Sequence, residues 1–445
     1  MMMSDLLYKS QPLLDISRNI PLFRTGKMLL RATVQNIFSQ PKQSQVLIYC
    51  TGAGLFERNG YSYNRYTGYF TESLDENAWS IEGQPYFTWP LPRSDRRLSF
   101  STPTKAMIRI LSLISASSVQ NKIATELVGR TEAHARGLLG WEMGSERKKW
   151  LVRLCSRQLA SYPLRRKYLE RWFRLVRPRL LLVEEGCYGH MAIINATAHE
   201  NGVPVAEFQH GMVSRGHDGY NFAPLLAASE AYRHTLPDYF LSYGSWWNTQ
   251  FNAPVEKVII GNPHRTALLE QVIPPRSGRR RVLVLGDGIE TELYLQFCHE
   301  LTELLSDSYR VIFRPHPLER DRILGMREAL SARFAIDHGS HIYLSLANAH
   351  AVIAEVSTGL FDAVGLAERI FVWNTAKSRF SLPEHPFSSV HSAPDLARKL
   401  QNFHGDGLPS VDPEEIWASD WQSRFKRFID EVFSANSRRG MVPKS

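Results

Sequence analysis

Hydrophobic residues occur in short unbroken runs, separated by stretches in which apolar residues recur every three or four positions. The first pattern is typical of buried strands and the second of amphipathic helices. The runs that fit strands are Gln45–Thr51, Arg179–Val183, Val203–Phe208, Asp238–Tyr243, Val255–Ile260, Arg281–Leu285, Tyr309–Phe313, Ala351–Ala354 and Arg369–Trp373. Strands that alternate with helices predict parallel βαβ units, and therefore an α/β fold.

The stretch from Ala351 to Asn374 shows this alternation most clearly. It predicts a strand, a turn, a helix and a second strand, with Ser357-Thr358-Gly359 at the start of the helix. Hydroxyl groups there can cap the first free N–H groups. The same N–H groups, together with the helix dipole, can bind an anion. Taken alone, Ser357 and Thr358 fit a plain cap and an anion site equally well.

A second polar set follows the predicted strand Tyr309–Phe313. It consists of Arg314-Pro315-His316-Pro317, in which the two prolines hold His316 in extended backbone. Ligands of open parallel sheets bind at the carboxyl ends of the strands. Arg314 and His316 at one strand end, and the Ser357–Gly359 turn at another, predict a phosphate or pyrophosphate site.

A third polar set lies at the predicted strand ends of the earlier part of the chain. Glu184-Glu185-Gly186 follows one apolar run, and Gln209-His210-Gly211 follows the next. A carboxylate at a strand end can accept a proton from a substrate hydroxyl, and burial or a second carboxylate adjusts its pKa. His210 could orient a phosphate, act as an acid or satisfy a buried backbone group. Two adjacent glutamates also fit ordinary surface charge.

The 445 residues exceed the size of one ordinary core and predict more than one domain. The turn formers and charges of Pro274–Arg280 indicate a hinge, after which the alternation of strands and helices begins again. We expect an N-terminal segment (1–44), an N-terminal Rossmann-like acceptor domain (45–275) with a helical insertion at about 104–177, and a C-terminal Rossmann-like nucleotide domain (276–445).

Residues 1–44 mix Leu and Ile with Lys and Arg, which fits either an amphipathic helix on an anionic bilayer or packing against the body. Gly52–Pro103 shows no clear period and predicts long loops or short strands. The helical insertion carries a strongly basic face. This face fits simple solvation, or contact with acidic lipid or a polyanionic acceptor. Its basic residues include Arg147, Lys148, Lys149, Arg165, Arg166, Lys167, Arg171 and Arg174.

The formal net charge of +9 indicates an anionic partner without choosing among nucleic acid, membrane and phosphorylated substrates. The four cysteines are widely spaced and form no CxxC pair, which favours a reducing compartment over a disulfide framework or zinc site. No signal-peptide pattern and no run long enough to span a membrane is present. We therefore expect a cytoplasmic protein, peripheral on the inner face of the membrane if residues 1–44 bind it.

Familiar cofactor motifs are absent from the sequence. There is no Walker loop, no HExxH and no GxGxxG after a strand, since Gly286-Asp287-Gly288 lacks the third glycine. ATP hydrolysis and dinucleotide binding are therefore disfavoured. We expect neither a metal nor another cofactor.

Three of these polar sets, in chain order, resemble the (D/E)(D/E)G, HP and S(S/T) motifs of bacterial sialyltransferases and polysialyltransferases: Glu184-Glu185-Gly186, Arg314–Pro317 and Ser357–Gly359. The HP and ST elements also resemble those of capsule Kdo transferases and CDP-glycerol glycerophosphotransferases. The segment FQHGMVSRGHDGY around His210 is similar to that of surface-polysaccharide glycosyltransferases. The resemblance covers roughly Arg179 to Asn374, and the residues before it match no pattern.

The resemblance implies a GT-B fold, in which two Rossmann-like domains face one another across a cleft. It implies that Glu184 or Glu185 is the general base on the acceptor hydroxyl. It further implies that His316 contacts the donor phosphate, and that Arg314, Pro317, Ser357, Thr358 and Gly359 belong to the donor site. Gln209, His210 and Gly211 would then face the acceptor or the cleft.

The resulting hypothesis is a metal-independent glycosyltransferase that moves a sugar, with CMP-linked sialic acid or Kdo favoured, onto a bacterial surface polysaccharide or lipid-linked glycan. A CDP-polyol phosphotransferase of the teichoic-acid type and a sugar-nucleotide epimerase remain alternatives. The net charge leaves a nucleic-acid-binding protein as a rival of another class. Against that rival, the basic residues do not interleave with aromatics in a recognisable module, so we expect no nucleic-acid partner.

Overall fold

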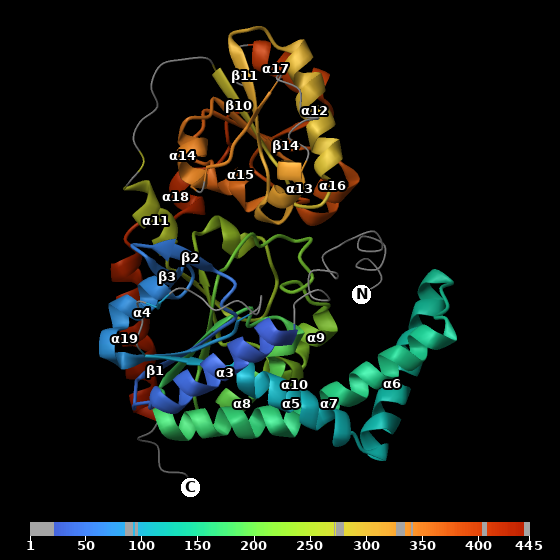
Figure 1. The fold of residues 1–445 in the computed structure, drawn as a ribbon, viewed down its shortest axis with the longest axis vertical. Helices are drawn as coiled ribbons and strands as arrows, with labels where there is room; N and C mark the ends of the chain where they lie inside the picture. The colour runs from blue at the N-terminus through green and yellow to red at the C-terminus, as the bar shows by residue number, and fades with distance from the viewer. Residues whose placement is uncertain are drawn as a thin grey trace. The chain divides into compact units, whose positions relative to one another are not determined.

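The computed structural model describes residues 22–84, 92–93, 97–270, 272, 280–325, 334–339, 341–402 and 407–439. The chain forms two compact units (Figure 1). Within the described residues, unit 1 consists of Gln209–Ala228 and Tyr239–Val432. Unit 2 consists of the residues up to Phe208, with Ser229–Asp238 and the chain from Phe433 on. The predicted domain boundary at residues 275 and 276 lies outside the described residues, as do residues 1–21 and all of the predicted hinge except Arg280.

A parallel seven-stranded sheet has the order β5-β4-β1-β6-β7-β8-β9. Its strands are β1 (Val46–Cys50), β4 (Ala78–Glu82), β5 (Leu98–Phe100), β6 (Leu180–Glu184), β7 (Val205–Phe208), β8 (Tyr239–Ser242) and β9 (Glu256–Ile259). Numbered within the sheet, this order is 3-2-1-4 followed by the remaining strands in sequence, which is the Rossmann arrangement. The order of the strands reverses between β1 and β6.

A parallel six-stranded sheet in unit 1 has the order β12-β11-β10-β13-β14-β15. Its strands are β10 (Arg280–Leu285), β11 (Tyr309–Arg314), β12 (Ala335–Ile336), β13 (Ala351–Ala354), β14 (Arg369–Trp373) and β15 (Ser388–Val390). This is again the Rossmann order, with its reversal between β10 and β13. The predicted α/β class and the two Rossmann-like domains are confirmed.

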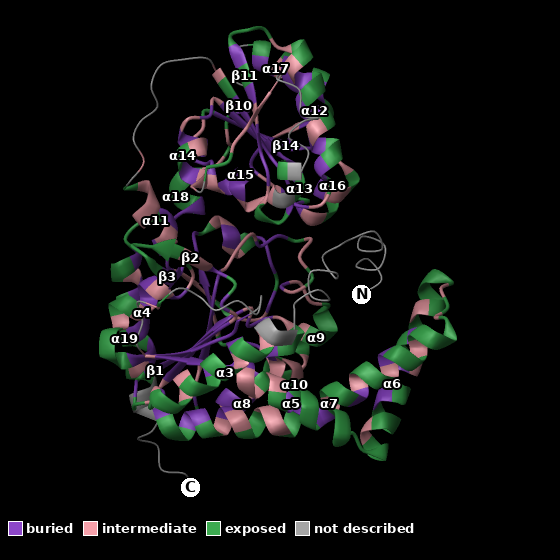
Figure 2. Cartoon of the chain, in the orientation of Figure 1, coloured by how far each residue is buried: buried purple, intermediate pink, exposed green. Residues whose placement is uncertain are grey.

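Both sheets are buried because helices cover them, which is why their strands read as continuous apolar runs (Figure 2). In unit 2, α7 (Ser145–Val176) and α8 (Ala192–Glu200) pack on β1, β4, β6 and β7, with Trp172 and Phe173 in the core. In unit 1, α12 (Thr291–Leu304) and α17 (Ala393–Gln401) bury Phe297 and Leu396 against β10, β11, β13 and β14.

The stretch from residue 52 to 103 contains more regular structure than its sequence predicted. It forms the antiparallel pair β2 (Leu55–Arg58) and β3 (Tyr61–Asn64), the helix α4 (Gly68–Leu74) and the short helix η1 (Asp75–Asn77) before β4 and β5. Trp79 and Ile81 of β4 are buried in the sheet core. The run AWSIE lacks the aliphatic content of the other strands, so tertiary packing rather than composition makes it a strand.

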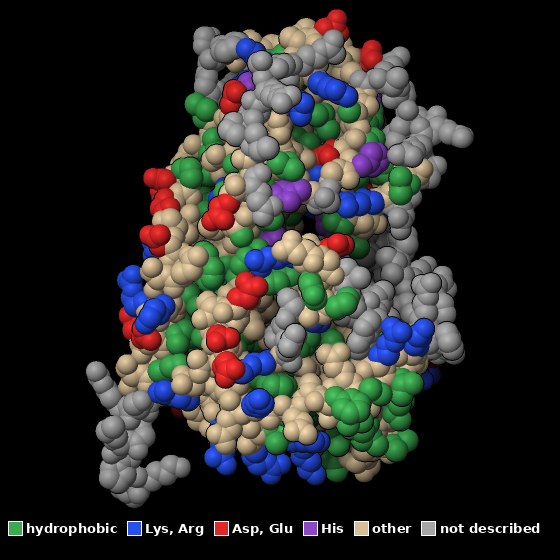
Figure 3. All heavy atoms as spheres, turned by 60° about the vertical axis from the view of Figure 1, so that its left-hand side comes forward, with side chains coloured by type: hydrophobic (Ala, Val, Ile, Leu, Met, Phe, Trp, Pro, Cys, Tyr) green, Lys and Arg blue, Asp and Glu red, His purple; other side chains and the backbone are tan. Residues whose placement is uncertain are grey.

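The chain between Thr102 and Val176 forms α5 (Thr102–Ile114), α6 (Ser118–Leu139) and the long α7. The helix α6 and the adjoining part of α7 project from the rest of unit 2 (Figure 1). Upstream, α3 (Leu22–Phe38) packs beside β5 and α5. Exposed hydrophobic side chains and Lys and Arg side chains gather near one another at the lower right of Figure 3. Among the described helices, none is long and apolar enough to cross a membrane.

Candidate functional site

The carboxyl edge of the six-stranded sheet gathers the polar residues predicted to hold a phosphate. The loops after β11, β10 and β13 lie side by side there, because these strands are neighbours in that order. The His316 loop and the Ser357 loop are two strands apart, or about 10 Å at standard strand spacing. The loop Gly286–Gly288 lies between them at the reversal of strand order. This is the position at which open α/β sheets bind ligands.

His316 is held in place by hydrogen bonds to both its ring and its backbone. Its Nδ1 accepts a hydrogen bond from Leu318 N at 3.2 Å, and its backbone N donates to Glu319 Oε1 at 2.6 Å. Glu319 is fully buried, and its other oxygen accepts from Thr291 Oγ1 at 2.6 Å. The half-buried His316 ring is therefore fixed at the start of the short helix η4 (Pro317–Glu319). Pro317 is the first residue of η4 and is exposed.

Gly286 and Gly288 make room for this network, a role that the sequence did not reveal. A Cβ on Gly286 would lie 2.0 Å from Glu319 Oε1, and one on Gly288 would lie 2.8 Å from His316 Nδ1. Gly288 also has a φ of +84°, in the left-handed region that favours glycine. The turn thus serves close packing on His316, although it lacks the third glycine of a dinucleotide motif.

Arg314 is directed into the protein rather than presented to solvent. Its Nη1 lies 2.6 Å from Asp337 Oδ2 and 3.1 Å from Ser345 Oγ, and its side chain is 7% exposed. Burial alone would raise the pKa of Asp337. The hydrogen bonds from Ser345 and Arg314 nevertheless hold this pKa below its usual value. In this arrangement Arg314 braces the loop that carries His316.

The Ser357–Gly359 turn begins α15 (Thr358–Asp362), which is shorter than the helix that the sequence predicted. Ser357 Oγ accepts a hydrogen bond from Gly359 N at 3.1 Å, so it acts as the N-cap. A Cβ on Gly359 would lie 2.6 Å from Leu285 Cδ1, which explains why glycine is needed for the close approach to β10. Thr358 and Ser357 are both half-buried at the sheet edge.

A cluster of one lysine and three carboxylates, which the sequence did not predict, links the loops at this edge of the sheet. Lys377 Nζ lies 3.1 Å from Glu290 Oε2 and 3.0 Å from Glu355 Oε2, and it also contacts Asp287 Oδ2. The carboxylates come from the loops after β10 and β13, and Lys377 comes from α16 (Ala376–Ser381), after β14. Burial would lower the pKa of Lys377, but Asp287 and Glu355 raise it overall. Lys377 therefore supplies the positive charge among these three carboxylates.

In unit 2, Glu184 ends β6 beside the reversal of strand order. Its Oε2 accepts hydrogen bonds from Thr51 N at 2.8 Å and Thr51 Oγ1 at 2.5 Å, across from the end of β1. Its Oε1 is buried and has no partner among the described residues. Burial raises the pKa of Glu184, while the Thr51 hydrogen bonds oppose that shift. A carboxylate with one oriented and one unengaged oxygen is suited to accept a proton.

Glu185 differs from its neighbour in every one of these respects. It adopts a left-handed φ of +58°, and its half-buried carboxylate pairs with His190 Nε2 at 3.2 Å. The adjacent Gly186 is needed because a Cβ there would lie 2.8 Å from Val183 Cγ2 and 3.1 Å from Glu207 Cβ. The EEG sequence therefore makes a tight turn that leaves Glu184 in the sheet edge.

The Gln209–Gly211 loop is organised by its first residue. Gln209 is buried, accepts a hydrogen bond from Tyr243 N at 2.8 Å and donates one to Gly211 O at 2.9 Å. Gln209 thus joins the loops after β7 and β8. His210 is half-buried, and a Cβ on Gly211 would meet no neighbour, so no close packing demands glycine there. Gln209 therefore has a bracing role.

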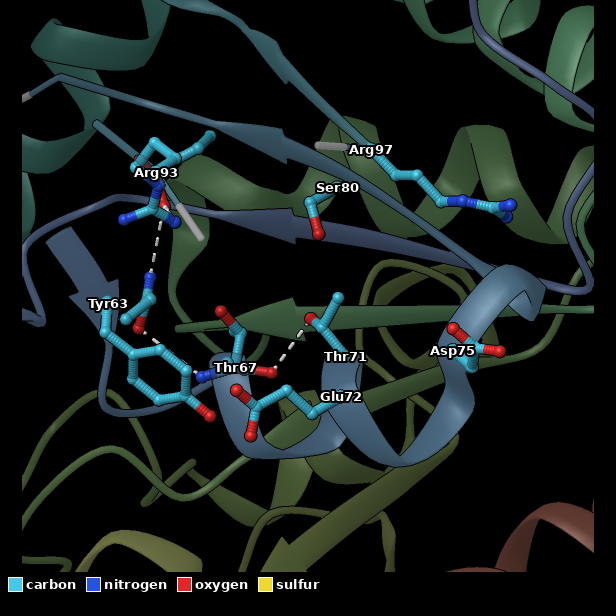
Figure 4. A pocket seen from close by; sticks show the side chains of 11 residues that line it. Tyr63, Thr67, Thr71, Glu72, Asp75, Ser80, Arg93 and Arg97 are labelled. Carbon is cyan, nitrogen blue, oxygen red and sulfur yellow. Dashed lines mark hydrogen bonds and ion pairs between the residues drawn. The ribbon is translucent and has the colours of Figure 1, made fainter. Parts of the chain in front are cut away.

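A polar cavity of about 340 Å³ lies in unit 2 between α4 and β4 (Figure 4). Thr67, the N-cap of α4, and Thr71 on α4 face Ser80 on β4, and Arg93 and Arg97 lie at opposite ends. Glu82, at the carboxyl end of β4, pairs with Arg93 Nη2 at 2.8 Å. Glu82 is not among the predicted site residues, because the run AWSIE that it ends is too poor in aliphatic residues to predict a strand. The lining residues are Tyr63, Asn64, Thr67, Gly68, Thr71, Glu72, Asp75, Ser80, Glu82, Arg93 and Arg97.

The fold of the chain also occurs in proteins of known structure. Its fold is similar to that of a Listeria monocytogenes protein assigned as a UDP-N-acetylglucosamine 2-epimerase, with 10% identity and a TM-score of 0.50 over 88% of this chain and 96% of the other. The fold is GT-B-like. At this identity the likeness concerns the fold alone. No protein-family model matches the chain, and no curated protein sequence matches it.

Other solved structures are similar to a lesser degree. The wall teichoic acid polymerase TagF matches with 12% identity and a TM-score of 0.45 over 96% of this chain and 98% of its own. The S. aureus MnaA–UDP structure matches with 10% identity and a TM-score of 0.48 over 88% of this chain and 97% of its own. The predicted GT-B fold is confirmed, whereas the likeness to sialyltransferases in particular remains a prediction.

Proposed function

We propose that the protein is a nucleotide-sugar-dependent glycosyltransferase whose donor binds at the carboxyl edge of the six-stranded sheet. The observation that carries this proposal is the gathering of Gly288, His316 and Ser357–Gly359 around the reversal of strand order. A diphosphate or monophosphate leaving group carries negative charge, which an imidazole and oriented N–H groups stabilise. CMP-linked donors are favoured by the motif resemblance.

In this proposal Glu184 is the general base on the acceptor hydroxyl. Its burial, raised pKa and unengaged Oε1 support that role over Glu185, whose carboxylate pairs with His190. The acceptor glycan binds unit 2, for which the mixed acidic, basic and hydroxyl lining of the cavity beside Glu82 is suited. The reaction is a displacement: the acceptor oxygen bonds to the anomeric carbon, the nucleotide phosphate leaves, and Glu184 takes the proton.

The experiment that tests the donor site is thermal unfolding with CMP, CDP, UDP, GDP and ADP. A nucleotide at 100 times its Kd should stabilise the protein by about 2.7 kcal/mol. We expect that stabilisation to be lost in His316→Ala and kept in His391→Ala, a matched control at an exposed histidine of the same unit. Failure of every nucleotide to stabilise the wild-type protein would remove the proposal.

The identity of the stabilising nucleotide separates the alternatives. A preference for CMP supports a CMP-sugar donor, and a preference for CDP favours a CDP-polyol phosphotransferase. A preference for UDP or GDP favours a hexosyltransferase or an epimerase. These last two differ in that an epimerase converts the nucleotide sugar without any acceptor.

A further inference from the structure

The surface of unit 2 carries apolar stripes that no described residue covers. On α5, Met107, Ile110, Leu111 and Ile114 repeat at the helical period and are 54%, 63%, 36% and 80% exposed. The opposite face of α5 already packs inward through Ile108. A surface helix normally has one apolar stripe, which faces the core. A second, exposed stripe therefore indicates an interaction surface.

The neighbouring helix α3 has the same two-sided pattern. Ala32 is buried with Leu98 and Phe100, and the Asn36 side chain pairs with both backbone groups of Phe100 at the sheet edge. One face of α3 therefore packs against the sheet edge. Its other face is apolar and exposed, so packing leaves a stripe available for another contact. That stripe consists of Leu30, Val34, Ile37 and Phe38.

A groove of about 390 Å³ opens beside these stripes, between α5, the end of α3 and the second half of α7. Met107 and Leu111 line it together with Leu164 and Leu175, so its wall is continuous with the α5 stripe. Lys167 and Arg171, one helical turn apart on α7, also line it. Both are exposed, and neither forms an ion pair with a described residue.

The groove therefore offers an apolar wall and two positive charges to a single ligand. A ligand with an apolar chain and an anionic group would contact the leucines and the two cations together.

We infer that this face, formed by α3, α5 and the groove against α7, docks on an anionic phospholipid bilayer, with a lipid phosphate held by Lys167 and Arg171. Apolar side chains flanked by basic ones are the chemistry that binds such surfaces. Basic residues of α7 that continue beyond the groove add attraction; they include Arg153 and Arg157. The inference does not rest on the proposed glycosyl transfer.

The test is flotation of the full-length protein with vesicles of phosphatidylcholine alone and of phosphatidylcholine mixed equally with phosphatidylglycerol. We expect binding to the mixed vesicles only. Reversing two basic charges at the surface, in Lys167→Glu with Arg171→Glu, should lower the partition coefficient about tenfold or more. Ile110→Ser with Ile114→Ser should lower it by a similar factor.

Matched controls carry the same chemical changes elsewhere. Lys426→Glu with Arg427→Glu reverses two exposed charges on α19 (Trp421–Arg439), and Leu225→Ser removes an apolar side chain that is 83% exposed. Both controls should float as the wild-type protein does, and all variants should keep its melting temperature. Equal losses in controls and test variants would overturn the inference, since general charge would then explain binding.

The remaining outcomes also decide the matter. Wild-type protein that ignores phosphatidylglycerol overturns the inference. The inference is also overturned if the protein self-associates without binding vesicles and becomes monomeric in sedimentation when Ile110 and Ile114 are replaced. A second copy of the chain, not a membrane, would then cover the face. Native mass spectrometry should show one retained phosphatidylglycerol that Lys167→Glu with Arg171→Glu releases.

Discussion

At the scale of single residues, Gly288 is the position at which backbone conformation and the candidate donor site meet. Gly288→Ala introduces left-handed strain of about 1–2 kcal/mol and a Cβ 2.8 Å from His316 Nδ1. Gly60 has a similar φ of +77°, but no atom within 4 Å of an added Cβ. We expect both variants to lose stability, and only Gly288→Ala to lose nucleotide affinity. Calorimetric titration with the nucleotide measures these affinities. Equal affinities of the two variants would show that Gly288 does not belong to the nucleotide site.

Glu184 carries a prediction about pH. A base must be deprotonated, and burial raises the pKa of this carboxyl, so transfer should fall as pH drops through a value above the usual Glu pKa of about 4.3. In Glu184→Gln we expect kcat to fall by roughly 10²–10⁴ and the acidic limb of the pH–rate profile to disappear. Glu185→Gln should keep that limb. If Glu185→Gln were the variant that lost it, the assignment would pass to Glu185.

At the scale of elements, Lys377 holds together the loops after β10, β13 and β14. Asp287 and Glu355 are almost fully buried around it, and removing one partner of a buried pair typically costs about 3–5 kcal/mol. Lys377→Met should therefore lower the free energy of unfolding by about that amount, as measured with urea. Lys426→Met, which removes an exposed pair with Asp430, should cost about 0–1 kcal/mol.

The loss in Lys377→Met should also depend on pH in a defined direction. In the wild-type protein burial alone would raise the pKa of Asp287, but the hydrogen bond and charge of Lys377 help to hold this pKa below its usual value. The stability that this provides is complete above the unfolded pKa and is lost as pH falls through the lower folded one. We therefore expect the deficit of Lys377→Met relative to wild type to shrink as the pH falls below the usual Asp pKa of about 3.9. A deficit that stayed constant would mean that lost packing, not charge, explains it.

At the scale of the whole molecule, the two sheets share one arrangement. Each has the Rossmann order, and each presents its candidate residues next to the reversal of strand order. Glu184 occupies that place in one sheet, and Gly288 and Ser357 occupy it in the other. The apolar surface of α3 and α5 belongs to neither edge, so catalysis and membrane docking would use separate parts of the chain.

The sequence alone determined the α/β class, most strands and the helical character of about residues 104–177, because periodicity and apolar runs are local properties of the chain. It also placed Glu184, His316 and Ser357 at strand ends, because the end of an apolar run is visible in one dimension. It did not identify β4, whose residues become a strand only through their neighbours, and it made α15 too long.

Only the tertiary structure decided which strand ends are neighbours, because strand order is set by long-range pairing. It alone showed that Arg314 braces a loop, that Glu319 and Gly286 fix His316, and that Lys377 neutralises carboxylates far away in sequence. It also separated Glu184 from Glu185, which are identical in sequence terms, because one is buried and the other is ion-paired. Burial and pairing are properties of the folded chain, so no local pattern records them.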